Sequence, residues 1–94
     1  MKIRVKKVID GDTFQDSRNR FFRLANVNTP EKRERGYQRA KDTLSNLIDG
    51  KDLIADVEGI SYNRKVIIAR SLGEKTTINE KMQKKGYKQK LTDQ

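Results

Sequence analysis

The chain has 94 residues, which is enough for one small domain and too few for two. It contains no cysteine and no histidine, which excludes disulfides, thiolate zinc sites, thiol nucleophiles and imidazole acid–base chemistry. Twenty-two Lys and Arg residues against thirteen Asp and Glu residues give a formal net charge of +9. This basic balance favours a polyanionic partner, nucleic acid ahead of an acidic membrane surface, over a surface that is merely soluble.

Membrane spans and targeting signals are not indicated by the sequence. No stretch is long and apolar enough to span a bilayer. The N-terminal segment MKIRVKKVID alternates apolar and basic residues and lacks the continuous apolar run of a signal peptide. We therefore predict a cytoplasmic protein that does not bind membranes, with a secreted form whose signal has been removed as the alternative.

The first 27 residues predict three consecutive β-strands. Apolar and basic residues alternate in the first strand, and Asp10-Gly11-Asp12 is typical of a tight turn between paired strands. Residues 16–19 form a polar turn, and a third strand follows over residues 21–27. If these strands pair in order, the end of the third strand approaches the Asp-Gly-Asp turn.

The apolar period then changes to that of a helix. From about residue 34 to residue 48, an apolar stripe that opens at Tyr37 predicts an amphipathic helix, with Gly50 as its left-handed cap. Residues 53–57 and 66–69 are typical of two further strands.

The C-terminal part predicts a second, short helix. Thr77 and Glu80 have the spacing of a capping box, and the helix stops at Gly86. Three strands, a helix, two strands and a helix follow one another in the order of an OB-fold. We predict a mainly β protein with a five-stranded OB-fold Greek-key barrel and two helices, in one domain of residues 1–94 whose last residues, about 88–94, form a frayed tail.

The charged residues leave a short list of possible chemistry. Without histidine or cysteine, the groups available for catalysis and binding are carboxylates, arginines, lysines and a hard metal ion held by oxygen. Asp10 and Asp12 on the first turn, and the segment 28–31 after the third strand, are ordinary turn and loop sequences when taken singly. Arg23, between apolar strand neighbours, either faces solvent or reaches a phosphate with its planar fork. Arg64 alone indicates only another surface arginine.

Several motifs, taken in order, carry a resemblance over roughly residues 5–87. They are Ile9-Asp10-Gly11-Asp12-Thr13, Phe22-Arg23-Leu24, Val27-Asn28-Thr29-Pro30-Glu31, Tyr62-Asn63-Arg64, and Ile78-Asn79-Glu80 followed by Gly86. Together they resemble the thermonuclease (staphylococcal nuclease-like) family, whose fold is an OB-fold barrel with helices. The resemblance implies a hydrolase: a Ca²⁺-dependent nuclease that cuts DNA and RNA, prefers single strands and leaves 3′-phosphates. We expect the protein to be a monomer.

The resemblance implies a role for each matching residue. Arg23 and Arg64 would be catalytic arginines on the phosphate, and Glu31 would orient or deprotonate the attacking water. Tyr62 would line the nucleotide pocket. The implied metal ligands are Asp12, Asn28 and the backbone carbonyl of Thr29, with Asp10 in the outer shell.

Three departures from the family bear on activity. Asn28 stands where the family has an aspartate, so the site loses one negative charge and its Ca²⁺ affinity should fall. Asn63 replaces a glycine, and asparagine tolerates the left-handed conformation that such a turn requires. The chain is a short member without the family's C-terminal helix, which we expect to leave the substrate pocket more open.

Two classes of function therefore stay open. A metal-dependent nuclease explains why both arginines and Glu31 occur together, since a barrel does not need them. The alternative is a non-catalytic nucleic-acid-binding OB-fold module whose metal site is degraded by Asn28. A protein-interaction domain explains the net charge poorly. Turnover, rather than binding, discriminates the two leading hypotheses.

Overall fold

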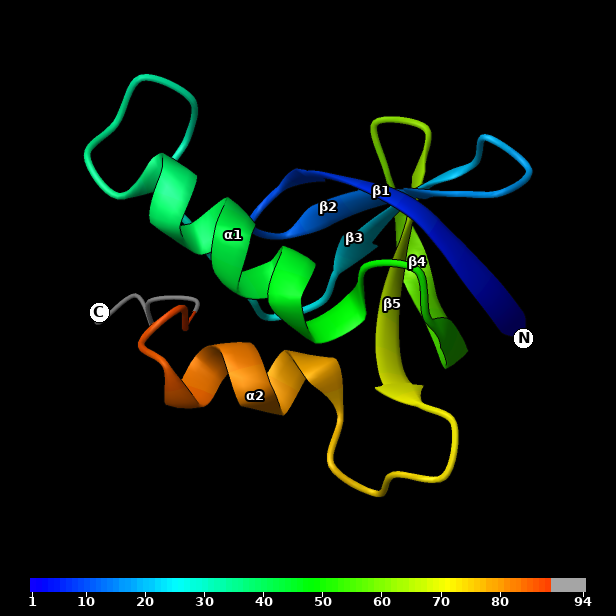
Figure 1. Ribbon diagram of the computed structural model, residues 1–94. Helices are drawn as coiled ribbons and strands as arrows, with labels where there is room; N and C mark the ends of the chain where they lie inside the picture. Colours follow the sequence, from blue (N-terminus) through cyan, green and yellow to red (C-terminus); the bar gives the residue numbers. More distant parts are fainter. Residues whose placement is uncertain (89–94) are drawn as a thin grey trace, which may run out of the picture.

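The computed structural model describes residues 1–88 as five strands and two helices (Figure 1). The elements are, in chain order, β1 (Lys2–Asp10), β2 (Thr13–Asp16), β3 (Phe21–Leu24), α1 (Tyr37–Ile48), β4 (Asp52–Ser61), β5 (Arg64–Ser71) and α2 (Ile78–Lys84).

The five strands close into a barrel with the neighbour order β1-β2-β3-β5-β4. Strands β1 and β2, β2 and β3, β4 and β5, and β4 and β1 pair antiparallel, whereas β3 and β5 pair parallel. Strand β5 can run parallel to β3 because α1 and β4 separate the two in the chain. This strand order is that of the OB-fold, so the predicted fold class is confirmed.

Strand β1 changes face halfway along its length. Ile3 and Val5 alternate with exposed basic residues, but Lys6 and Lys7 are exposed in succession and the next buried residue is Val8. The pairing with β2 is irregular between Val5 and Lys7, as in a β-bulge. The extra residue places the side chain of Val8 in the core, and the strand continues from there to the β1–β2 turn.

Several predicted strand boundaries were wrong, and β5 extends beyond its predicted residues 66–69 at both ends. The third strand was predicted over residues 21–27 but ends at Leu24, because Asn26, with φ 61°, turns the chain away from the sheet. Strand β4 extends beyond the predicted residue 57 to Ser61. An irregularity in its pairing at Gly59 allows the strand to bend and continue.

The first helix begins later than the apolar pattern predicts. Gly36 has φ 89°, a left-handed conformation that interrupts a right-handed helix, so α1 starts at Tyr37 rather than near residue 34. Its end agrees with the sequence, since Gly50 follows with φ 70°. The helix packs against β1 with Ala40 and the other buried residues of its stripe, Leu44 and Ile48.

The second helix has the predicted capping box. Thr77 Oγ1 accepts a hydrogen bond from Glu80 N at 3.0 Å, and Thr77 N donates to Glu80 Oε1 at 3.3 Å. Asn79, which is buried, attaches the helix to the barrel through three backbone groups: Ala25 O, Ile67 O and Ala69 N. These bonds fix α2 against β5 and the end of β3.

Both helices lie on the same side of the barrel (Figure 1). Phe14 and Phe22 stack inside the barrel with ring centroids 5.6 Å apart. The other members of the buried core come from β1, β3, β4 and β5, from both helices and from Val27 after β3. No helix in the described part of the chain is long and apolar enough to cross a membrane.

The segment after α2 returns to the end of β3. Asn28 N donates to Tyr87 O at 3.3 Å, and Lys88 forms an isolated bridge with Val27. The frayed tail predicted for about 88–94 lies, apart from Lys88, outside the described residues. The bridge brings the end of the described chain to the rim of the barrel where the candidate site lies.

Candidate active site

One groove of about 990 Å³ gathers most of the residues that the sequence singled out. It lies between the β1–β2 turn, the segment after β3, the start of β5 and the segment after α2. Seven of the eight predicted site residues line it: Asp10, Asp12, Arg23, Asn28, Thr29, Glu31 and Arg64. The remaining lining residues are Pro30, Lys32, Glu34, Gly86, Tyr87 and Lys88.

Gly11 allows the β1–β2 turn to approach the rest of the site. A Cβ atom at this position would lie 2.8 Å from the Cβ of Ala40 in α1 and 2.8 Å from the Cγ2 of Thr29. The glycine is therefore required by the lack of space. Its close contact places the carboxylates of Asp10 and Asp12 beside the segment that follows β3.

A chain of hydrogen bonds joins the two arginines to one carboxylate. Arg64 Nη1 donates to Thr13 Oγ1 at 3.1 Å, and Thr13 Oγ1 donates to Asp12 Oδ1 at 3.0 Å. From the other side, Arg23 Nη2 donates to Asp12 Oδ2 at 3.4 Å. Thr13 is buried and links these hydrogen bonds, although its place in the sequence indicates only the last residue of a turn motif.

Both arginines keep donors that could bind an anion. Arg23 donates Nη1 to Leu24 O at 2.9 Å and Nη2 to Val27 O at 3.2 Å, in addition to its bond to the carboxylate. Arg64 also donates Nε to Ser61 O at 3.4 Å. A guanidinium carries five N–H donors. Within residues 1–88, two therefore remain on Arg23 and three on Arg64, and the bonds already made hold the planar groups in place.

Glu31 presents its carboxylate from a loop that is braced from within. Glu31 N donates to Glu34 Oε1 at 2.6 Å, and Glu34 N donates back to Glu31 O at 2.8 Å. In the described part of the chain, no hydrogen bond is donated to the carboxylate of Glu31. Glu34 therefore positions the backbone of Glu31 and leaves the side chain of Glu31 available. In the sequence, the three-residue spacing of the two glutamates is the signal that could have indicated this contact.

Tyr37 is a second residue that the sequence analysis did not assign to the site. Its hydroxyl lies 3.0 Å from Ile9 O and 3.0 Å from Asp10 Oδ1. Burial, together with the hydrogen bond to Asp10 and the negative charge of that carboxylate, raises the pKa of Tyr37 above its usual value. The hydroxyl therefore remains a donor that holds Asp10, whereas the sequence indicated only the first residue of a helical stripe.

Tyr62 lies outside this groove. It lines an adjoining hollow of about 420 Å³ that also contacts Arg23, Asn28 and Arg64. Its side chain is 89% exposed at the tip of the β4–β5 hairpin. Tyr62 has φ 50° and Asn63 has φ 65°, so both central residues of the turn are left-handed, as in a type I′ hairpin. The turn that was expected to tolerate asparagine is present.

The oxygen donors of the groove suit a hard cation, but they carry little charge. Within residues 1–88, no group of three or more acidic side chains lies close enough to hold a metal ion. Asp12 accepts hydrogen bonds on both carboxylate oxygens. In the same range, neither the carbonyl of Thr29 nor the side-chain amide of Asn28 takes part in a hydrogen bond. Two neutral oxygens and one carboxylate fit Ca²⁺ by donor type, with a low ligand charge.

The charges that line the groove balance each other. Four acidic residues (Asp10, Asp12, Glu31 and Glu34) face four basic ones (Arg23, Lys32, Arg64 and Lys88), whereas the whole chain carries +9. A bound phosphate would therefore meet carboxylates as well as guanidinium groups. A divalent cation near the carboxylates would make the groove favourable for an anion.

Fold and groove together define an OB-fold protein with a groove that is lined by both arginines and carboxylates. The family model described as staphylococcal nuclease homologue matches residues 21–93, and the chain therefore belongs to this family. The match contains every predicted site residue except Asp10 and Asp12, which precede it and which the fold brings into the same groove. No curated protein gives a match to the chain.

Proposed function

We propose that the protein is a metal-dependent nuclease that hydrolyses phosphodiester bonds of DNA or RNA with Ca²⁺, prefers single strands and leaves 3′-phosphates. The observation that carries the proposal is the hydrogen-bonded chain from Arg23 through Asp12 and Thr13 to Arg64, in the groove that Glu31 also lines. We further propose that residues 1–94 act as one domain and as a monomer.

The arginines would bind and stabilise the phosphate. As hydroxide or water attacks phosphorus, negative charge builds on the phosphoryl oxygens. The remaining N–H donors of Arg23 and Arg64 could each hydrogen-bond such an oxygen. A guanidinium group keeps its positive charge over the pH range in which proteins work. Their existing bonds hold them in advance, which lowers the reorganisation needed during the reaction.

Glu31 would accept a proton from the attacking water. The chain has no histidine that could act as the base. Two glutamates of the loop before α1 line the groove, and Glu34 already accepts a hydrogen bond from Glu31 N, so Glu31 is the one whose carboxylate is available. A carboxylate close to the nucleophile can orient water and take its proton in the transition state. The hydrogen bonds of Glu34 to the backbone would keep this group in a fixed place.

Asp12, the side-chain oxygen of Asn28 and the carbonyl oxygen of Thr29 would hold Ca²⁺, with Asp10 in the outer shell. The ion would supply positive charge to the phosphoryl oxygens. Asp12 would then serve both the cation and Arg23, and Thr13 and Tyr37 would keep the two carboxylates oriented. Tyr62, with its exposed ring beside the arginines, would contact the nucleotide base.

A second candidate is a binding module that has lost catalysis. The specific observation that favours it is the low charge of the donor set, since Asn28 is neutral and no group of three acidic side chains is gathered within residues 1–88. Such a protein would keep the basic surface and the arginine donors. It would bind an oligonucleotide without cutting it.

Cleavage of a fluorescent single-stranded oligonucleotide tests the proposal. We would measure it with Ca²⁺, with Mg²⁺ and with a chelator, for the unmodified protein, for Glu31→Gln and for Glu58→Gln. Glu58 is exposed on β4 and outside the groove, so it controls for the loss of one carboxylate. We expect cleavage that requires metal, persists in Glu58→Gln and is lost in Glu31→Gln. Binding without cleavage in any metal would instead establish the binding module.

A further inference from the structure

The groove does not end at the candidate site. Gly86 and Lys88 line it and also line a second hollow of about 480 Å³ over the C-terminal end of α2. The other residues of that hollow are Glu80, Gln83 and Lys84. Because the two hollows share residues, a flexible chain bound at Arg23 and Arg64 can continue past Tyr87 and across the end of the helix.

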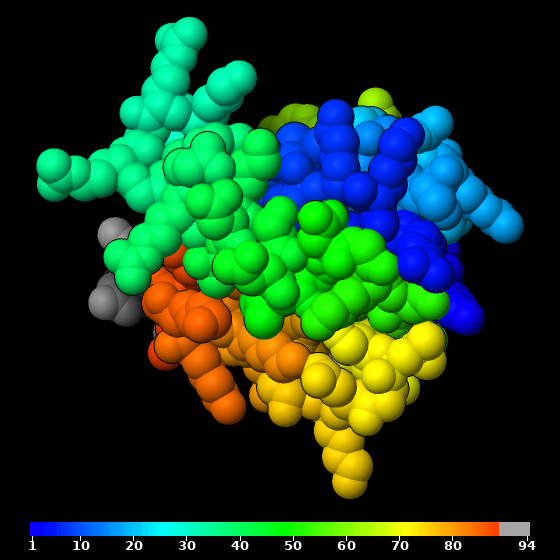
Figure 2. All heavy atoms as spheres, viewed as in Figure 1, coloured from blue at the N-terminus to red at the C-terminus, as the bar shows by residue number. Residues whose placement is uncertain are grey.

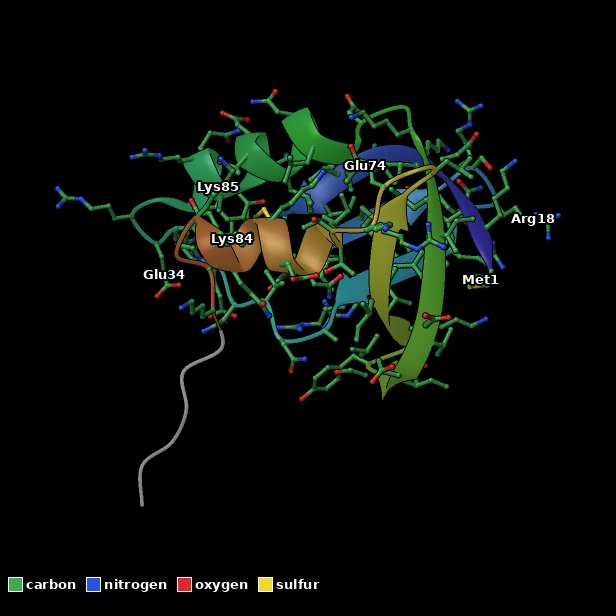
Figure 3. All side chains as sticks on the ribbon, turned by 90° about the horizontal axis from the view of Figure 1, so that it is seen from below. Met1, Arg18, Glu34, Glu74, Lys84 and Lys85 are labelled. Carbon is green, nitrogen blue, oxygen red and sulfur yellow. The ribbon has the colours of Figure 1, made fainter. Side chains whose placement is uncertain are left out.

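Basic side chains occur among the residues that line the two hollows and next to them in the chain. On the loop before α1 they are Lys32, Arg33 and Arg35, and on and after α2 they are Lys84, Lys85 and Lys88; all six are exposed. Figure 2 shows long side chains of the loop projecting from the surface, and Figure 3 shows Lys84 and Lys85 at the end of the molecule where Glu34 lies. We call these six residues the α2 track.

Two acidic groups near the track already accept hydrogen bonds. Glu34 accepts a hydrogen bond from the backbone of Glu31, and Glu80 accepts from both the backbone and the hydroxyl of Thr77 in the capping box. Among the described residues, no salt bridge involves Lys32, Lys84 or Lys85. The positive charge of the track is therefore available to an anionic partner.

We propose that the α2 track binds the backbone of the single-stranded nucleic acid beyond the phosphate held at Arg23 and Arg64. This inference rests on the proposed function for the identity of the ligand. Flexible lysine side chains neutralise successive phosphates without reading sequence. A duplex has a persistence length of about 500 Å, whereas the molecule measures 36 × 27 × 27 Å, so a single strand can turn over the helix at a much lower bending cost than a duplex.

The opposite end of the molecule provides a control surface. Lys2 and Arg18 are exposed there, next to Met1, and far from Lys84 and Lys85 (Figure 3). The other two arginines of that end, Arg4 and Arg20, are paired with Asp52 and Asp16. A double substitution at Lys2 and Arg18 therefore removes two positive charges without touching the track.

Binding measured without turnover tests the track. Fluorescence anisotropy in a chelator would give the affinities for a single-stranded trinucleotide, a single-stranded 12-mer and a 12-base-pair duplex, over a series of salt concentrations. We would compare Lys84→Gln/Lys85→Gln with Lys2→Gln/Arg18→Gln. The track variant should bind the 12-mer more weakly, with a salt slope lower by about 1.4, since each phosphate contact on a single strand contributes about 0.7. Its affinity for the trinucleotide should stay unchanged.

The possible outcomes separate this inference from the proposed function. If the two double variants lost the same affinity for the 12-mer, the proposed role of the track would be wrong. The same conclusion would follow if the track variant lost as much affinity for the duplex as for the 12-mer. Failure of the unmodified protein to cut any oligonucleotide with metal would overturn the nuclease and leave the binding comparison valid. Thermal melting checks folding, and we expect no large change because Lys84 and Lys85 are exposed.

Discussion

The hydroxyl of Thr13 links the two halves of the candidate site, because it accepts a hydrogen bond from Arg64 at 3.1 Å over a sequence separation of 51 residues. The same hydroxyl donates to Asp12 at 3.0 Å. In the sheet, Thr13 pairs directly with Arg23. One buried threonine of β2 therefore lies between a carboxylate and both arginines, and it determines how these charged groups are oriented.

Replacing Thr13 by valine should impair catalysis more than folding. Valine keeps the shape of threonine but cannot accept from Arg64 or donate to Asp12. A hydrogen bond to a charged group contributes about 1.5–3 kcal/mol, so we expect kcat/KM to fall at least about tenfold. Thr13→Ser keeps the hydroxyl and should retain most of the activity. A serine variant as impaired as the valine variant would show that packing, rather than the hydrogen-bond chain, is required.

Gly11→Ala should destabilise the protein and disturb the site. The new methyl group would lie 2.8 Å from both Ala40 Cβ and Thr29 Cγ2, closer than real contacts allow. Overpacking of this kind costs about 1–3 kcal/mol. Gly59→Ala is the matched control, because nothing lies within 4 Å of the added atom. Urea unfolding of both variants measures the difference; equal stability of the two would contradict the close approach of the turn.

The sequence predicted the fold well because its local signals agree with the tertiary structure. The Thr77–Glu80 capping box formed as its spacing indicates, and Gly50 follows α1 in the left-handed conformation. The errors occurred where single residues change the backbone. The left-handed residues Asn26 and Gly36, which end β3 early and delay the start of α1, have no periodic signal.

For the candidate site, the motifs predicted residues that lie together in one groove, but not how these residues are arranged. Motif order placed seven of the eight predicted residues in one groove, but it assigned no contact to Thr13 or Tyr37. Tyr37 has the spacing of a core residue in an amphipathic helix, and only the position of α1 beside the β1–β2 turn makes its hydroxyl a partner of Asp10. Hydrogen bonds between distant segments cannot be derived from spacing along the chain.

Asp16 should make stability depend on pH below about pH 5. It is buried, and burial alone would raise its pKa, but hydrogen bonds from the side chain and backbone of Arg20, the charge of Arg20 and the backbone of Arg18 hold the pKa below the ordinary value of 3.8. A lowered carboxyl pKa stabilises the fold above the ordinary pKa, and this stabilisation is lost as the pH falls through the lowered value.

The variant Asp16→Asn tests this sign. It lacks the charge at every pH, so at pH 7 it should be less stable by about 1–3 kcal/mol. The difference in unfolding free energy between the two proteins should become smaller as the pH falls. The reason is that Asp16 becomes protonated and then also lacks the charge that Arg20 stabilises. Urea unfolding at pH 7, 5, 4 and 3 measures this difference. A difference of constant size down to pH 3 would assign the effect to packing alone.

Asn28→Asp should strengthen metal binding, because Ca²⁺ affinity rises with the number of charged ligands. Asn28 lines the groove and is exposed, so a carboxylate there costs little desolvation. We expect the Ca²⁺ concentration for half-maximal cleavage to fall about tenfold. Ca²⁺ should also raise the melting temperature of the variant more than that of the unmodified protein, since ligand binding stabilises the folded state.

The matched control for this change is Asn26→Asp. Asn26 is exposed two residues earlier, outside the groove, and its left-handed backbone with φ 61° suits aspartate as well as asparagine. The control adds the same negative charge near the site without adding a ligand. If position 28 faces the metal, only Asn28→Asp shifts the two Ca²⁺ titrations. Equal shifts in both variants would mean that added charge anywhere on this loop attracts the cation, and position 28 would then not be a ligand position.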